Sequence, residues 1–274
     1  MISAKRVNTS HGALHYEQHG AGANEVLFLH GNSLSGRVFK HQLSAPGFND
    51  CRMTTFDFPG HGDSDNSPIP ETTYTLPGFA DATVQLIAAL KLKHPVIVGW
   101  SMGGHIAIEL MARLPRLRGV FLIGSPPVGK VNGVNDRTLG FKGSPAGSLA
   151  GKEEWSNEEA TVFVHRIFLG SEDHELIETA KRADGRFRTR MFHGSLEGLG
   201  VNQREVVEAS TLSIAIVNGE LDTGLNLEYF DSLHYKNLWN GKVVRQPGVG
   251  HAPFWQAPQE FNASLRSFLS DLDR

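Results

Sequence analysis

The sequence predicts an α/β fold in which a mostly parallel sheet is flanked by helices and carries an inserted helical cap. Short apolar, β-branched or aromatic runs recur along the 274 residues and alternate with stretches of helical periodicity. This alternation is typical of parallel sheets with helices on both faces. The second observation is a G-x-S-x-G motif, Gly99 to Gly103, which stands between an apolar run and a helix-like stretch. A strand, a sharp turn and a helix are therefore predicted around Ser101.

The predicted elements follow the apolar pattern from the N-terminus onward. Residues 7–19 are predicted to form a hairpin, because Ser10, His11 and Gly12 lie near a turn and alternating apolar residues follow them. The strands predicted after it are 26–29, 53–58, 96–98, 120–123, 214–217 and 242–245. Helical spacing of apolar residues predicts helices within 79–90, 106–111 and 261–269.

The segment from about Pro127 to Ser210 breaks this rhythm. It contains no strand-like run, and residues 158–169 and 174–183 are helix-prone. A structureless connection of this length would be unusual. We therefore predict a core made of residues 1–127 and 211–274 and a helical cap over residues 128–210. The first part of the cap, residues 129–151, is rich in Gly, Ser and Asn and is predicted to be a mobile entry loop.

Composition disfavours several classes of partner. The chain is 40 % hydrophobic and 20 % charged, which suits one sizeable core. A net charge of -3 offers no field that attracts phosphate backbones or anionic lipids. We therefore expect a small-molecule substrate, and neither nucleic acid nor membrane as a partner. Nothing in the sequence indicates a dedicated protein partner, and we expect a monomer or a small homo-oligomer.

The sequence also indicates a cellular compartment. Cys51 is the sole cysteine and has no internal disulfide partner. Residues 1–6 lack the apolar core of a signal peptide, and no apolar run approaches the roughly 20 residues that span a bilayer. We therefore expect a cytoplasmic protein.

Ser101 is the candidate nucleophile. A serine at a sharp strand-to-helix turn is held in a strained backbone conformation that keeps its hydroxyl clear of the neighbouring chain. Only small flanking residues permit this turn, and Gly99, Gly103 and Gly104 supply them. Near neutral pH such a hydroxyl needs a base, and the base needs a carboxylate that holds its tautomer.

His251 is the candidate base, since it follows the last strand-like run and precedes the final predicted helix. The expected chain order is serine, acid, histidine. Asp222, 29 residues before His251, is the first choice for the acid because it lies just after the predicted strand 214–217. Glu220 remains the alternative, because a one-residue change in turn geometry would exchange the orientations of the two side chains. The turn after the preceding strand, residues 124–127, carries no carboxylate.

Two backbone N–H groups are predicted to hold the oxyanion that forms when the hydroxyl attacks a carbonyl. One belongs to Met102, the residue after the nucleophile, and the other to Asn32, in the loop after the first parallel strand. Losing one such donor costs on the order of 10²-fold or more in rate. His105, one turn into the helix after Ser101, is expected to pack or to hydrogen-bond structurally.

No metal or other cofactor is predicted. The loop from Asp57 to Ser64 mixes histidine and aspartate, but it holds one histidine, and the sequence contains no motif with paired His or Cys ligands. Asp57 and His61 are therefore expected to shape the loop beside the pocket. A group of basic residues is expected to form a solvated face of the cap: Lys181, Arg182, Arg186, Arg188 and Arg190.

Together these motifs resemble the α/β-hydrolase family over the full length of the chain. More closely, the chain is similar to the metal-independent N-acyl-homoserine lactone hydrolases of this fold, the quorum-quenching lactonases. The similarity is carried by residues 30–33, 59–62, 99–106, 108–109, 126–128, 202–204, 217–219, 237–239, 241–242 and 250–254. The G-x-S-x-G motif and the late Gly-His pair indicate the fold alone, whereas residues 202–204 and 237–239 are less generic and indicate the subfamily.

The resemblance implies a mechanism without a cofactor. Ser101 would attack the lactone carbonyl, His251 would accept its proton, and the acyl-enzyme would be hydrolysed to the ring-opened N-acyl-homoserine. Trp155, Phe163 and Phe254 are the candidates for an acyl pocket. The lactonase pattern has a tyrosine where Phe163 falls, and the acid turn in this chain is one residue longer.

Other functions share these residues. A general carboxylesterase, or a hydrolase of carbon–carbon bonds in ring-cleavage products, would use the same triad. A small-molecule receptor that keeps the triad and turns over slowly is a third alternative. Epoxide hydrolases and haloalkane dehalogenases of this fold use an aspartate nucleophile, which Ser101 rules against.

Overall fold

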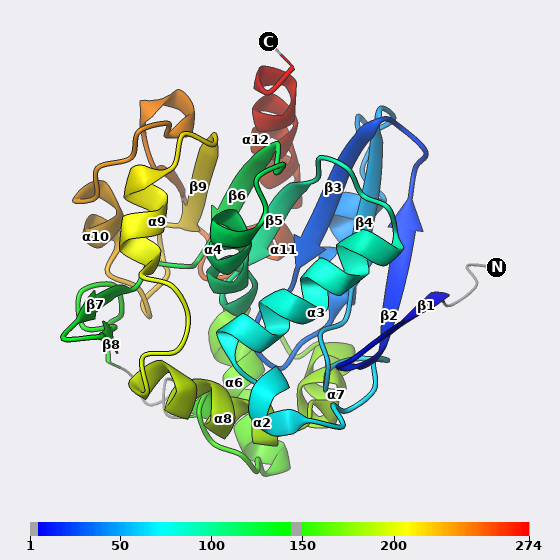
Figure 1. Ribbon diagram of the computed structural model, residues 1–274, viewed down its shortest axis with the longest axis vertical. Coiled ribbons are helices and arrows are strands. Elements are labelled where there is room, and N and C mark those ends of the chain that lie inside the picture. Colours follow the sequence, from blue (N-terminus) through cyan, green and yellow to red (C-terminus); the bar gives the residue numbers. More distant parts are fainter. Residues whose placement is uncertain (1–4, 144–148, 274) are drawn as a thin grey trace.

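The computed structural model describes residues 5–143 and 149–273. Within them, eight strands form one sheet in the order β1-β2-β4-β3-β5-β6-β9-β10 (Figure 1). Their bounds are β1 Lys5–Thr9, β2 Gly12–His19, β3 Asn24–Leu29, β4 Cys51–Phe56, β5 Val96–Trp100, β6 Gly119–Ile123, β9 Ile214–Gly219 and β10 Val244–Gln246. The pairs β1–β2 and β2–β4 are antiparallel, and the other pairs of this sheet are parallel, as the sequence predicts.

The central strands are buried on both faces of the sheet. Successive side chains of a strand point to opposite faces. In β3, Leu27 and Leu29 pack into the hydrophobic core on one face, whereas Val26 and Phe28 pack into the core on the other. The uninterrupted apolar runs of the sequence are therefore the pattern of parallel strands that helices cover on both sides.

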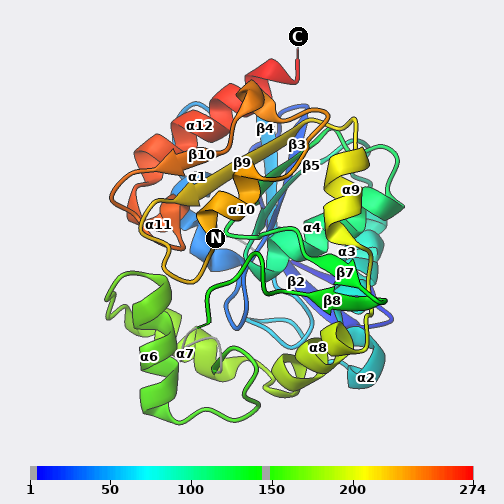
Figure 2. The same cartoon turned by 90° about the vertical axis from the view of Figure 1, so that its left-hand side faces the viewer.

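Helices cover both faces of the sheet (Figures 1 and 2). One face carries α3 (Leu76–Ala89), α4 (Met102–Arg113) and α9 (Gln203–Ala209), and the other carries α1 (Lys40–Leu43), α11 (Pro253–Gln256) and α12 (Pro258–Asp271). The short helices α2 (Pro70–Thr73) and α10 (Leu227–Asp231) lie in connections. Among the described residues, no helix is long and apolar enough to cross a membrane.

Three helices lie beyond the carboxyl ends of the parallel strands, at the bottom of Figure 1: α6 (Asn157–Ile167), α7 (His174–Arg182) and α8 (Arg186–Leu196). The sequence specifies where α6 begins. Ser156 Oγ accepts a hydrogen bond from the N–H of Glu159, and the carboxylate of Glu159 accepts one from the N–H of Ser156. Asp173 caps the first turn of α7 with its carboxylate. The division into a core and a cap over residues 128–210 stays a prediction.

The prediction that residues 127–210 lack strands is wrong. β7 (Gly129–Val131) and β8 (Val134–Asp136) pair as a short antiparallel hairpin. Its Val131 and Val134 are 58 % and 43 % exposed, so the hairpin has no apolar run that a sequence pattern would reveal. α9, at the end of the same segment, packs against α4 on the core. The predicted entry loop, residues 129–151, contains this hairpin, and its residues 144–148 lie outside the described residues.

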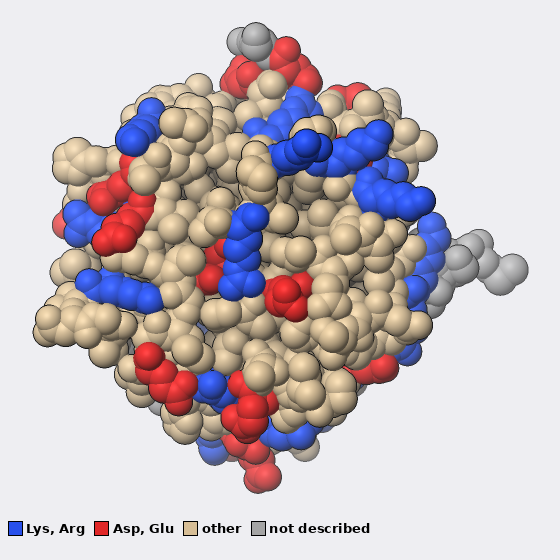
Figure 3. Space-filling view, in the orientation of Figure 1, with Lys and Arg blue, Asp and Glu red and all other residues tan. Residues whose placement is uncertain are grey.

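Charged side chains of both signs are interspersed among uncharged ones on the face shown in Figure 3. Arg37 and Asp63 form one exposed ion pair of the protein, with 2.8 Å between the guanidinium and the carboxylate. This mixture agrees with the small net charge of the chain. Exposed pairs of this kind contribute little to the stability of the fold.

Candidate active site

Ser101 stands at the turn between β5 and α4. Its backbone has φ 54° and ψ −118°, a strained conformation for a residue with a side chain. The flanking glycines are required by close packing: a Cβ at Gly103 would lie 2.2 Å from the carbonyl oxygen of Leu29, and one at Gly104 would lie 2.0 Å from Ser125 Oγ. The motif therefore folds into the strand–turn–helix arrangement that it predicts.

His251 and Asp222 come together from two loops at the same edge of the sheet. Asp222 follows β9 and His251 lies between β10 and α11. Nδ1 of His251 is 2.6 Å from Oδ2 of Asp222. The Trp100 indole N–H donates to the carbonyl oxygen of His251 at 2.8 Å, which holds the loop against the end of β5.

The surroundings of Asp222 decide which ring nitrogen of His251 carries the proton. Asp222 is only 8 % exposed, and the N–H of Gly224 donates to its Oδ1 at 3.0 Å. Burial alone would raise the pKa of Asp222, but the charge and hydrogen bond of His251 and the N–H of Gly224 outweigh burial and lower the pKa below 3.8. The carboxylate is thus an acceptor near neutral pH. Nδ1 donates to it, and Nε2 of the neutral imidazole is left without a proton.

Glu220 does not contact the imidazole. Its side chain is exposed, while its backbone N–H donates to the carbonyl oxygen of Gln246. The geometry therefore places Asp222, and not Glu220, beside His251.

The contact of Gly124 with the ring of His251 was not predicted from the sequence. Gly124 has φ +63°, and a Cβ there would lie 2.8 Å from Cε1 of His251, so only glycine leaves room for the ring.

Asn32 and Met102 both line the cavity that contains Ser101 and His251. Met102 is the first residue of α4, so its N–H has no partner within the helix. Within the described residues, no group accepts a hydrogen bond from the N–H of Asn32. Both N–H groups are therefore available to an oxygen atom of a bound molecule.

The side chain of Asn32 is held by Ala150 and by its own neighbour, Ser33. Asn32 Nδ2 donates to the carbonyl oxygen of Ala150 at 3.1 Å, and Ser33 Oγ donates to Asn32 Oδ1 at 2.7 Å. Ser33 has φ 59°, a strained backbone conformation next to the candidate oxyanion donor. The guanidinium of Arg188, on α8, donates to Ser33 Oγ at 2.8 Å.

The expectation that Arg188 lies on a solvated face is wrong. Arg188 is 3 % exposed, and its guanidinium lies 3.9 Å from the ring centre of Trp155. It donates to the carbonyl oxygens of Lys152 and Glu153 at 2.7 and 2.6 Å. These bonds satisfy the buried cation, and no sequence pattern separates this arginine from its exposed neighbours.

The cavity has a volume of about 610 Å³, and Phe163 is the one member of the predicted acyl pocket on its wall. Trp155 does not line the cavity but packs behind Phe163, with ring centres 4.6 Å apart. Phe254 is fully buried in the core, 4.9 Å from the rings of both Trp100 and Phe39. Phe254 therefore does not line the cavity, and we no longer expect it to contact the substrate, because its ring packs in the core beside the sheet.

His105 also lines the cavity, and its Nδ1 lies 2.8 Å from Oε1 of Gln203. The expected structural hydrogen bond is thus present. Gln203 belongs to α9, so this bond joins two helices on the same face of the sheet. Burial lowers the pKa of His105 to about 4, which keeps the ring neutral near neutral pH.

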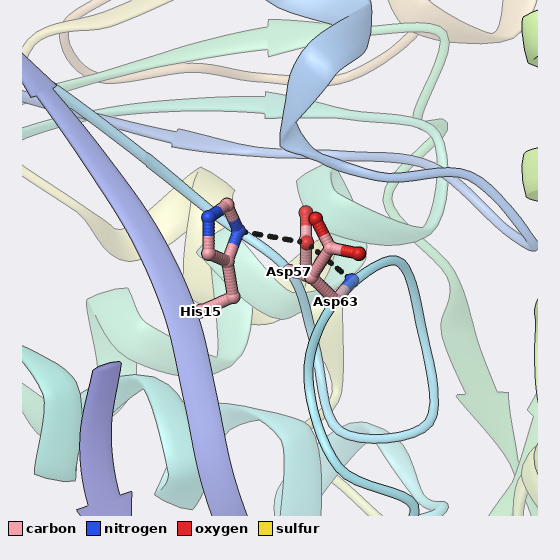
Figure 4. A group of neighbouring side chains, drawn as sticks. All are labelled: His15, Asp57 and Asp63. Atoms are coloured by element: carbon pink, nitrogen blue, oxygen red, sulfur yellow. Dashed lines mark hydrogen bonds and ion pairs between the residues drawn. The ribbon is translucent and has the colours of Figure 1, made fainter. Parts of the chain in front are cut away.

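Asp57 forms the centre of a second polar cluster, shown in Figure 4. Its carboxylate accepts hydrogen bonds from the N–H groups of Gly36 and Asp63 at 2.7 and 2.8 Å, and Nδ1 of His15 lies 3.1 Å from Oδ2. One ligand atom each of His15, Asp57 and Asp63 lies within 4.8 Å of the others, a spacing compatible with a metal ion. Three hydrogen bonds already occupy the Asp57 carboxylate, which agrees with the predicted role in shaping the loop. Sequence reasoning missed His15, because β2 brings it to this loop.

The chain belongs to the α/β hydrolase family. The model of that family, described as the alpha/beta hydrolase family, matches residues 26–264. Among solved structures, the chain is similar to N-acyl homoserine lactonase AidH complexed with N-butanoyl homoserine, with a TM-score of 0.94 and 36 % identity over 99 % of this chain and 97 % of that one.

Curated relatives are more distant or shorter in their match. The pimeloyl-(acyl-carrier protein) methyl ester esterase of Pectobacterium atrosepticum is 24 % identical over 93 % of this chain and 98 % of its own length. The AB hydrolase superfamily protein YisY of Bacillus subtilis is 35 % identical over 38 % of this chain and 37 % of its own length. The family and these relatives, which include an esterase and a lactonase, support the assignment of this chain as a hydrolase.

Proposed function

We propose that this protein is a serine hydrolase that opens the lactone ring of N-acyl-homoserine lactones through an acyl-enzyme intermediate. The observation that carries the proposal is one cavity that contains Ser101 at its strained turn and the hydrogen-bonded pair His251 and Asp222. The similarity to a lactonase over nearly the whole chain supports the choice of substrate.

The first half of the reaction forms the acyl-enzyme. Ser101 Oγ attacks the lactone carbonyl carbon while Nε2 of His251 accepts the hydroxyl proton, and Asp222 stabilises the imidazolium that results. The carbonyl oxygen becomes an oxyanion and accepts hydrogen bonds from the N–H groups of Asn32 and Met102. When the tetrahedral intermediate collapses, the bond from the carbonyl carbon to the ring oxygen breaks and His251 protonates that oxygen. The ring is then open and the acyl group is bound to Ser101.

The second half regenerates the serine. Water loses a proton to His251 and attacks the acyl carbon, the same two N–H groups hold the second oxyanion, and the bond to Ser101 Oγ breaks as His251 returns the proton. The product is the N-acyl-homoserine with a free carboxylate. The amide of the substrate is spared, because the lactone ester is the better electrophile.

A carboxylesterase acting on open-chain esters is the second candidate, and Phe163 is the observation that favours it. The lactonase pattern has a tyrosine at this position. Phe163 lines the cavity without a hydroxyl and packs on Trp155. An apolar wall of this kind accepts acyl chains of simple esters equally well.

Ring opening of short- and long-chain N-acyl-homoserine lactones in the presence of EDTA tests the proposal. We expect a kcat/KM of roughly 10⁴ M⁻¹s⁻¹ or above, unaffected by the chelator. Ser101→Ala is expected to lose several orders of magnitude in kcat, because triad members act as a unit. Circular dichroism of the variant checks that it is folded.

The alternatives give different results in the same assay. Turnover of aryl esters without lactone opening would replace the lactonase by a carboxylesterase. Tight lactone binding with negligible turnover in the wild type would indicate a receptor. Activity of Ser101→Ala within a few-fold of the wild type would refute the mechanism itself.

A further inference from the structure

Arg137 is a cation on the cavity wall that forms no ion pair with any other described residue. Its guanidinium lies 4.3 Å from the ring centre of Phe141 and 4.8 Å from that of Phe192. Over residues 5–143 and 149–273, its side chain takes part in no ion pair and no hydrogen bond. Residues 1–4, 144–148 and 274 carry no Asp or Glu side chain. Among the described residues, the contacts of this guanidinium are therefore with aromatic rings.

The guanidinium is available to a molecule in the cavity. Arg137, Phe141 and Phe192 line the same cavity as Ser101 and His251. A guanidinium held against aromatic rings keeps its N–H groups at the rim of its plane, where they form paired hydrogen bonds with a carboxylate. Burial lowers the pKa of Arg137 to about 10, so the side chain is still charged at neutral pH.

His105 lies on the cavity wall together with Ser101 and Arg137. It lies one turn of α4 after Ser101, and its ring centre is 5.8 Å from that of Phe141, on which Arg137 lies. Because the His105 ring is neutral near pH 7, it does not compete with Arg137 for an anion. His105 and Phe141 thus form a series of ring contacts between the helix that begins after Ser101 and Arg137.

Among the described residues that line the cavity, the charged side chains without an ion-pair partner are positive. Two acidic side chains line the cavity, and both are occupied: Glu109 by Arg113 at 3.2 Å and by the N–H of Val201 at 2.7 Å, and Asp222 by His251. Lys142 and Arg166 lie on the same wall, and neither forms an ion pair with another described residue. A cation partly removed from water is stabilised by a counter-ion.

We propose that this end of the cavity binds a carboxylate of the substrate through Arg137. The enzyme then prefers esters whose acyl part ends in a carboxylate, such as half-esters of dicarboxylic acids, over uncharged esters of the same length. This inference rests on the proposed ester hydrolysis at Ser101 and adds a second substrate class to the lactones. Its distinguishing feature is a negative charge remote from the bond that is cleaved.

Matched esters test the preference. The monomethyl esters of glutaric, adipic and suberic acid are compared with methyl pentanoate, hexanoate and octanoate. At the best chain length, the kcat/KM of the charged ester should exceed that of the neutral one by about 10- to 100-fold, the effect of a charged hydrogen-bonded pair. Arg137→Met should bring this ratio to about one, and Arg137→Lys should keep part of it.

Arg190→Met is the matched control, because Arg190 lies on α8 and pairs with Glu197 at the surface. It should retain the ratio of the wild type. A wild-type ratio of one or less at every chain length overturns the proposal. An unchanged ratio in Arg137→Met overturns it as well.

Binding to Ser101→Ala separates this inference from the proposed reaction. Calorimetry should show monomethyl adipate binding about 10-fold or more tightly than methyl hexanoate, and Arg137→Met in the same background should remove the difference. If the wild type hydrolyses no ester but this difference is present, the proposed function fails and the carboxylate site stands. If esters are hydrolysed and binding shows no difference that depends on Arg137, the carboxylate site fails alone.

Discussion

Asp222 and Glu220 lie two residues apart on one turn, yet their surroundings differ. Asp222 is buried against His251, whereas Glu220 is exposed. A turn of this length allows either carboxylate to face the imidazole. The pairing that the chain adopts depends on the neighbouring contacts, including the N–H of Gly224 on the Asp222 carboxylate.

Exchanging each acid for its amide therefore gives unequal results. Asp222→Asn should lower kcat about 10³- to 10⁴-fold, because the amide no longer holds the tautomer of His251 or stabilises its charge. Glu220→Gln should leave kcat essentially unchanged. Initial rates with an activated aryl ester near pH 8 measure both. A large loss in Glu220→Gln beside a mild one in Asp222→Asn would reverse the assignment of the acid.

At the scale of elements, α8 is linked to the loop after β3. Arg188 donates to Ser33 Oγ, and Ser33 Oγ donates to the side chain of Asn32, a residue that lines the cavity. The same guanidinium binds the carbonyl oxygens of residues 152 and 153. One side chain thus fixes the loop that carries the candidate oxyanion donor.

Arg188 is accordingly expected to act as a positioning residue. Arg188→Met should lower kcat about 10-fold or more with little change in KM, because the N–H of Asn32 is less well aligned with the oxyanion than with the neutral substrate. Arg188→Lys should restore part of kcat. Steady-state kinetics with one aryl ester measure both variants, and Arg190→Met is the control on the same helix, because Arg190 pairs with Glu197 and not with Ser33. A lower melting temperature with unchanged kcat would show that Arg188 only stabilises the fold.

At the scale of the whole molecule, His15 and Asp57 join β2 to the loop after β4. The hydrogen bond to Asp57 raises the pKa of His15 above 6.5, against the opposing effect of burial. Burial raises the pKa of Asp57, but the hydrogen bonds from His15 and from the N–H groups of Asp63 and Gly36 help to lower it below 3.8. Both partners are therefore charged when the pair is most stable.

The pH dependence of this stabilisation follows from the directions of the two pKa shifts, upward for His15 and downward for Asp57. The part due to His15 is complete below pH 6.5 and is lost as the pH rises through the folded-state pKa of the imidazole. The part due to Asp57 is complete above pH 3.8 and is lost as the pH falls through the folded-state pKa of the carboxyl. The pair contributes most between these two values.

His15→Gln should therefore lower the free energy of unfolding by about 1–3 kcal/mol between pH 4 and 6.5, and by less at more alkaline pH. Urea unfolding at several pH values measures the difference. His174→Gln is the control, because His174 is 86 % exposed. A destabilisation that grows from pH 6 to pH 9 would contradict the upward shift of the His15 pKa in the folded protein.

The layered architecture and the strand, turn and helix around Ser101 could be predicted from the amino-acid sequence alone. These features depend on residues close together in the chain: the alternation of apolar runs, and the glycines that permit the strained turn. The sequence also predicted His251 in the loop after the last parallel strand. It did not identify the acid that pairs with His251, since Asp222 and Glu220 fit the same pattern.

Contacts between residues far apart in the chain could be identified only from the folded structure. The packing of the elements pairs Asp222 with His251, buries Arg188 beside the loop after β3 and packs Phe254 in the core. It leaves Arg137 on the cavity wall without an ion pair to any other described residue. An arginine or a phenylalanine has the same local signature in each of these settings. Its burial and its partners are fixed only when separate elements pack together, because that packing determines which polar groups lose their contact with water.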